Sequence, residues 1–121
     1  MNTLDLLLKM EIPNPPEAQY KIKRLSKICG QDVVFKLRAL SYSRTAEIIR
    51  AQHEDMNVHI VLAGVVEPDL KSKELMEKYN AATPAEMLKK MLLPGEIEDL
   101  SRAIERLSGY RTDTIEEIKK K

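Results

Sequence analysis

Residues 92–110 read LLPGEIEDLSRAIERLSGY and contain every signal of one complete helix. Pro94 suits the first helical position, where its missing N–H leaves no bond unmade. Gly109 supplies the left-handed residue at which many helices stop. The apolar side chains between them repeat at helical spacing and form a single stripe, namely Ile97, Leu100, Ile104 and Leu107. We predict a surface helix from Pro94 to about Ser108, held on a core by one side.

The acidic residues of this helix, Glu96, Glu98 and Asp99, invite a catalytic interpretation that the spacing does not favour. Positions 96 and 98 point to different sides of a helix, so they do not form a pair of carboxylates. Carboxylates in the first turns complement the helix dipole, and Glu98 can pair with Arg102 four residues later. We interpret the cluster as structural.

Further helices are expected upstream of this stretch. Thr83-Pro84-Ala85-Glu86 is a capping box that opens a helix whose apolar stripe is Leu88, Met91 and Leu92. Other helices are predicted over about 43–52 and 72–79. The segment 56–66, MNVHIVLAGVV, is almost wholly apolar; its spacing favours a buried helix, and a short strand is the alternative.

The first third of the chain has a different pattern. Two runs in which apolar and polar residues alternate, about 20–25 and 33–40, flank a segment with Gly30 and Asp32 and predict a β-hairpin. Before it, Thr3 can cap a short helix with Leu4, Leu7 and Leu8 on one side, which is too short to be stable without docking.

These patterns together predict an α+β fold that is predominantly α-helical. About five to six short helices would pack on one N-terminal β-hairpin (residues ~20–40), whose apolar side needs such a cover. Residues 1–18 would form the short helix and a proline-rich linker, and residues 19–121 a single globular domain.

Composition narrows the class of protein. The 121 residues are 43% hydrophobic and 32% charged, with a net charge of +1. A single cysteine, Cys29, excludes an internal disulfide and fits a reducing cytoplasm. No apolar run approaches the roughly 18 residues of a membrane span, and the start lacks the features of a signal peptide. We expect a cytosolic protein that does not enter a membrane.

The spacing of the residues gives no support for a catalytic, cofactor or metal site. His53 and His59 lie six residues apart, which is not the spacing of a helical zinc pair. The glycines are scattered and form no phosphate loop. Cys29 has no histidine near it in sequence to activate it as a nucleophile. We predict a protein that is not an enzyme and uses no cofactor.

Two features could bind a partner. Residues 19–50 hold eight basic and two acidic side chains, and one side of the predicted hairpin carries Lys21, Lys23, Lys36 and Arg38. This basic hairpin could be a plain solvated surface, a docking surface for an acidic protein, or a nucleic-acid site. Nucleic acid is the least favoured of the three, because few aromatic residues accompany the cations.

The second feature is a methionine pair, Met87 and Met91, four residues apart on one predicted helix. Flexible thioethers suit surfaces that bind several partner conformations. The alternative, which the sequence favours, is that both fill the core.

Several segments resemble the XkdN-like phage tail assembly chaperones. They are LAGVVEPDL (62–70), LMEKYNAATPAEMLKKML (75–92) and LLPGEIEDLSRAIERLSGY (92–110), with IKRLS (22–26) and VVFKLRALSY (33–42) upstream. Their order and spacing cover roughly residues 4–118.

The resemblance implies a non-enzymatic protein that acts in the bacterial host cytoplasm while a phage or prophage tail is built. It implies two partners, the tape measure protein and the tail tube (major tail) protein, and absence from the mature virion. An assembly protein with exposed apolar helices can also self-associate. The alternative from the residues alone is a small nucleic-acid-binding regulatory protein that uses the basic hairpin.

Overall fold

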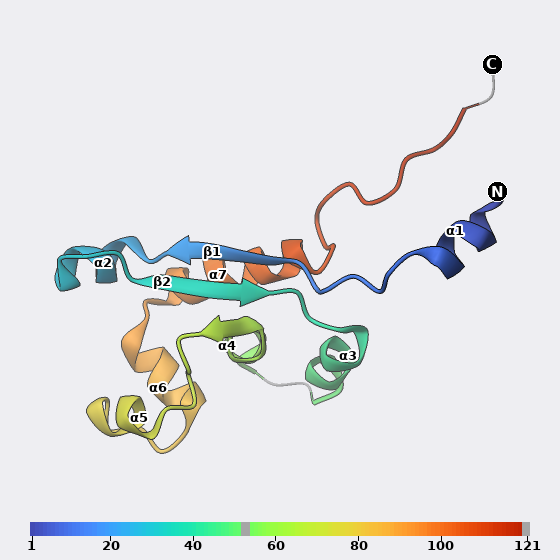
Figure 1. Cartoon of the computed structure of the whole chain (residues 1–121). Coiled ribbons are helices and arrows are strands. Elements are labelled where there is room, and N and C mark those ends of the chain that lie inside the picture. Colours follow the sequence, from blue (N-terminus) through green and yellow to red (C-terminus); the bar gives the residue numbers. More distant parts are fainter. Residues whose placement is uncertain (52–53, 120–121) are drawn as a thin grey trace.

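The structure is a computed structural model that describes residues 1–51 and 54–119. Helices and a small antiparallel sheet alternate along these residues (Figure 1). In chain order the elements are α1 (Thr3–Lys9), β1 (Glu17–Lys21), α2 (Lys23–Cys29), β2 (Val34–Arg38), α3 (Tyr42–Ala51), α4 (Met56–Gly64), β3 (Val65–Glu67), α5 (Lys73–Lys78), α6 (Pro84–Met91) and α7 (Pro94–Leu107).

The predicted architecture of five to six helices on an N-terminal hairpin is wrong. The described residues form seven helices and a three-stranded antiparallel sheet in the order β1-β2-β3. The two paired strands of the hairpin span residues 17–38, after α1 and not at the chain start, and α2 lies between them. The third strand, β3, joins the sheet from the second half of the chain.

Two local misreadings explain this error. Residues 20–23 alternate in polarity, but Ile22 and Leu25 are three residues apart, which is the spacing of a helix, and α2 begins at Lys23. Gly30, at φ 74°, ends α2 in the left-handed conformation, whereas the sequence pattern predicts that it belongs to a hairpin turn. The apolar segment 56–66 contains both predicted alternatives, because α4 ends at Gly64 and β3 begins at Val65.

The helix predicted from residues 92–110 is confirmed as α7. Its end is a Schellman motif: the N–H of Gly109 donates to the carbonyl of Arg106, and the N–H of Tyr110 donates to that of Glu105. The start of α6 is confirmed too, since the Thr83 hydroxyl accepts from the Glu86 N–H at 3.1 Å. Local sequence signals therefore place both helices correctly.

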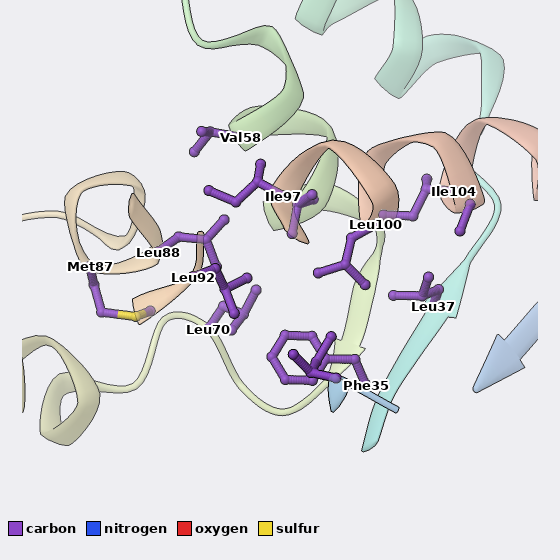
Figure 2. Packing of buried hydrophobic residues seen from close by; sticks show 13 residues of the cluster. Phe35, Leu37, Val58, Leu70, Met87, Leu88, Leu92, Ile97, Leu100 and Ile104 are labelled. Atoms are coloured by element: carbon purple, nitrogen blue, oxygen red, sulfur yellow. The ribbon is translucent and has the colours of Figure 1, made fainter. Parts of the chain in front are cut away.

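The core lies between α7 and the sheet. Phe35 and Leu37 on β2 are buried and face Leu100 and Ile104 on α7 (Figure 2). Leu88 on α6 extends this cluster away from the sheet. Helix α4 packs on α7 so closely that a Cβ on Gly64 would lie 2.6 Å from the Ile104 side chain.

The two ends of the chain lie outside this core. Every residue from Met1 to Glu17 is exposed, and no residue of α1 is buried. Helix α1 is confirmed as a helix, with Asn2 in place of Thr3 as its cap. The predicted helix over 43–52 is observed as α3, and Gln52 lies outside the described residues. No helix in the described part of the chain is long and apolar enough to cross a membrane.

Candidate partner-binding surfaces

The sheet places most of the basic hairpin on its solvent side. Directly paired residues share a face of a sheet, and β1 pairs with β2 so that Arg38 faces Glu17 and Lys36 faces Gln19. Phe35 and Leu37 point the other way, into the core. Lys36 and Arg38 therefore lie side by side on the outer face, as the alternation in the sequence predicted.

An acidic residue, Glu17, which the sequence pattern did not predict here, lies between them. The carboxylate of Glu17 pairs with Arg38 at 2.6 Å and with Lys36 at 3.6 Å. The hydrogen bond from Arg38 holds the pKa of Glu17 below its usual range, and the charge of Lys36 acts in the same direction. Glu17 therefore partly neutralises two of the four cations.

The remaining two cations lie at the other end of the hairpin. Lys21 ends β1, and its Nζ is 3.6 Å from a carboxylate oxygen of Asp32. Lys23 opens α2 and is exposed, and no ion pair joins it to a carboxylate within residues 1–51 and 54–119. The basic hairpin is thus two separated pairs of cations. Lys21, Lys36 and Arg38 are ion-paired, so Lys23 carries the charge most available to a partner.

Lys21 and Lys23 flank a groove of about 420 Å³ between β1, the start of α2 and α7. Tyr20 pairs with Phe35 and so shares the face that α7 covers, but β1 is the edge strand and Tyr20 stays 39% exposed. Leu100 and Ala103 of α7 also line the groove. Charged residues of both signs complete it, namely Arg24, Glu96, Asp99 and Arg106.

An ion pair between Arg24 and Glu96 lies at one end of this groove. The guanidinium of Arg24 donates two hydrogen bonds to Glu96, at 3.0 and 2.9 Å, and a third to the carbonyl of Met91 at 3.0 Å. The Arg24 hydrogen bond holds the pKa of Glu96 below its usual range, and the backbone N–H of Leu93 adds to the effect. Helices α2, α6 and α7 are therefore joined at this point, which gives the groove a rigid wall.

The methionine pair divides between core and surface. Met87 is fully buried among the core residues, and Met91 is half-buried at the end of α6. Burial of Met87 supports the core-filling alternative for that residue. Only Met91 presents part of its side chain to solvent, so it is the member of the pair within reach of a partner in this conformation.

A second hollow lies where α3, α4 and the end of α7 meet. The sequence pattern did not predict it. This apolar pocket of about 360 Å³ is lined mainly by Ile48, Ile49, Met56, Ile60 and Tyr110. Ile49 is 55% exposed and Tyr110 is 50% exposed. The adjacent pair Ile48-Ile49 is the sequence signal for it, because neighbouring helical residues cannot both face the core fully.

Cysteine and histidine are represented in the described residues by Cys29 and His59. Cys29 is exposed and carries a free thiol. His53 lies outside the described residues, and His59 is half-buried on α4. Among residues 1–51 and 54–119, no three His, Cys, Asp or Glu side chains form a group that could hold a metal ion.

Comparisons with known proteins agree with this fold. The sequence model of one family, described as Phage XkdN-like tail assembly chaperone protein, matches residues 4–120. A solved structure described as the crystal structure of the protein yqbn superposes with a TM-score of 0.72 at 22% identity. That match covers 91% of this chain and 98% of the other, and it shows a shared fold. A search of curated proteins gave no significant match.

Proposed function

Because this chain belongs to the XkdN-like phage tail assembly chaperone family, we propose that it binds the tape measure protein and brings tail tube subunits to it. In this role it acts in the bacterial host cytoplasm, remains outside the mature virion, and works by binding without catalytic turnover. The family match over residues 4–120 is the observation that carries the proposal.

The groove between β1 and α7 is the surface best suited to such a client. It combines an apolar wall, formed by Tyr20 and Leu100, with exposed charges at its edge. A groove of this kind accepts an amphipathic segment, whose apolar side replaces water while its polar side stays solvated. Lys23 gives the entrance a positive charge that favours an acidic client segment.

The edge of β1 adds a second mode of contact. In the described sheet β1 pairs on one side only, with β2, so its other edge presents backbone N–H and C=O groups. An extended client segment can hydrogen-bond to such an edge while its side chains enter the groove. The two contacts together hold a client without requiring one particular sequence.

Co-expression with the tape measure protein of the same phage tests the proposal. We expect this chain to raise the soluble fraction of the tape measure protein and to co-purify with it, and the tail tube protein to join the complex. An unrelated soluble protein of similar size, expressed in its place, serves as the control. Recovery of neither tail protein with this chain in pull-downs would reject the proposal.

A further inference from the structure

The first seventeen residues carry an apolar helix that contacts no part of the core. Helix α1 has Leu4, Leu7 and Leu8 on one side, and these side chains are 62%, 58% and 74% exposed. A capping box between Asn2 and Asp5 defines its start. A helix of seven residues is not stable alone in water, so a helix specified this carefully needs a surface to dock on.

The apolar pocket lies beside the point where this arm leaves the domain. The carbonyl of Pro16, the last residue before β1, accepts a hydrogen bond from the N–H of Ala39 at 2.9 Å. The next residue, Leu40, lines the pocket and donates to the hydroxyl of Ser108 at 2.9 Å. The arm and the pocket therefore share one edge of the molecule.

The arm is too stiff to reach back into that pocket easily. Seven residues, 10–16, separate α1 from β1, and Pro13, Pro15 and Pro16 lie among them. Proline fixes its own φ and holds the preceding residue in an extended conformation. A proline-rich spacer extends by about 3.1 Å per residue, which places α1 about 20 Å from the start of β1. Figure 1 shows α1 at the far end of this extended arm.

We propose that α1 of one copy docks in the apolar pocket of a second copy, so that the chain associates with itself by exchanging arms. The pocket is mainly apolar, as is the leucine side of α1, and its volume of about 360 Å³ lies in the range of pockets that bind small ligands, roughly 300–1,000 Å³.

The charges around the two surfaces are complementary. The pocket edge carries Glu105 and Arg111, which lie 3.7 Å apart. Helix α1 carries Asp5 at the edge of its leucine side, opposite in charge to Arg111, whose side chain is 65% exposed. Docking can therefore pair opposite charges at the edge while the leucines displace water from the centre.

Two matched pairs of full-length variants test the arm and the pocket separately. Leu7→Gln changes the leucine side of α1, and Leu6→Gln makes the same change on its opposite side. Ile49→Gln changes the pocket, and Ile28→Gln changes an isoleucine on α2 that is 70% exposed and lies outside the pocket. All four side chains are more than half exposed, so the domain should fold in each variant.

Sedimentation over a concentration series gives the self-association constant of each protein. We expect Leu7→Gln and Ile49→Gln each to weaken self-association by about tenfold, since each removes an apolar contact from the interface. Leu6→Gln and Ile28→Gln should leave it unchanged.

Three outcomes would overturn the proposal. The first is a wild-type chain that stays monomeric up to its solubility limit. The second is equal behaviour of Leu7→Gln and Leu6→Gln. The third is loss of association in Ile115→Gln, in the exposed C-terminal tail, without loss in Leu7→Gln, which would assign the pocket to that tail. No client protein is present in these measurements, so their result is independent of the proposed chaperone function.

Discussion

Arg24 and Glu96, 72 residues apart in sequence, form a two-bonded ion pair that ties the first third of the chain to α7. The side chain of Glu96 is only 18% exposed, and its Oε1 also accepts from the N–H of Leu93 at 2.7 Å. One carboxylate thus completes the cap of α7, receives the guanidinium, and defines one end of the groove. Glu96 therefore stabilises both the start of α7 and the contact between α7 and α2.

Removing the charge of Glu96 should destabilise the domain. Glu96→Gln replaces charge-assisted hydrogen bonds by neutral ones, and we expect the free energy of unfolding at pH 7 to fall by about 1 kcal/mol. Urea denaturation measures the change. Glu98→Gln is the matched control, because Glu98 pairs with Arg102 on the exposed side of the same helix. Its effect should stay within about 0.5 kcal/mol.

The contribution of Glu96 should also depend on pH in one direction. Arg24 lowers the pKa of Glu96 in the folded protein, so the stabilisation is complete above the ordinary glutamate pKa of about 4.3 and is lost as the pH falls through the lower folded value. The stability difference between wild type and Glu96→Gln should therefore shrink in acid. A difference that stays constant from neutral to acid pH would contradict this assignment.

The close approach of α4 to α7 should make Gly64 intolerant of a side chain. A Cβ at Gly64 would lie within 3.0 Å of three side-chain atoms of Ile104, which is itself fully buried. We expect Gly64→Ala to lower the free energy of unfolding by about 1–3 kcal/mol. Thermal or urea denaturation measures this loss.

Gly95 provides the control for that substitution. It lies in the first turn of α7, and a Cβ there would meet nothing within 4 Å. Gly95→Ala should be neutral or stabilising by up to about 1 kcal/mol, because alanine loses less conformational freedom in a helix. A cost at Gly95 equal to that at Gly64 would show that helix geometry, and not the contact with Ile104, sets the effect.

The outer face of the hairpin should not bind nucleic acid. Glu17 already pairs with Lys36 and Arg38, and a phosphate would have to displace it. We expect no mobility shift of single-stranded DNA or RNA at low salt for wild type; Glu17→Gln releases both cations and so removes this competition. A shift that Glu17→Gln strengthens and added salt abolishes would instead support the nucleic-acid alternative.

The entrance of the groove should contribute to client binding. Lys23→Glu reverses the charge beside Tyr20, and we expect it to weaken binding of the tape measure protein by about tenfold. Lys27→Glu is the matched control, because Lys27 lies one turn later on α2 and outside the groove. Titration of the co-purified complex gives both affinities. Equal affinities would remove the groove from the client-binding surface.

Single elements show which parts of the fold the sequence predicts. The start of α6 follows from Thr83 and Pro84, and the bounds of α7 follow from Pro94 and Gly109. The strand predicted over residues 20–25 is wrong in its second half. Ile22 and Leu25 are three residues apart, the spacing of a helix, and the chain forms α2 from Lys23 onward. The sequence pattern predicts the four cations, but not the ion pairs that three of them form with Glu17 and Asp32.

The sequence alone therefore determined the helices whose ends carry clear capping, proline or glycine signals, and the family to which the chain belongs. The tertiary structure decided the rest: the third strand, the Arg24–Glu96 pair, the contact of Gly64 with Ile104, and the two hollows. Each of these joins segments far apart in the chain. No spacing within a sequence encodes such contacts, because they depend on how closely separate helices and strands pack once the core has formed.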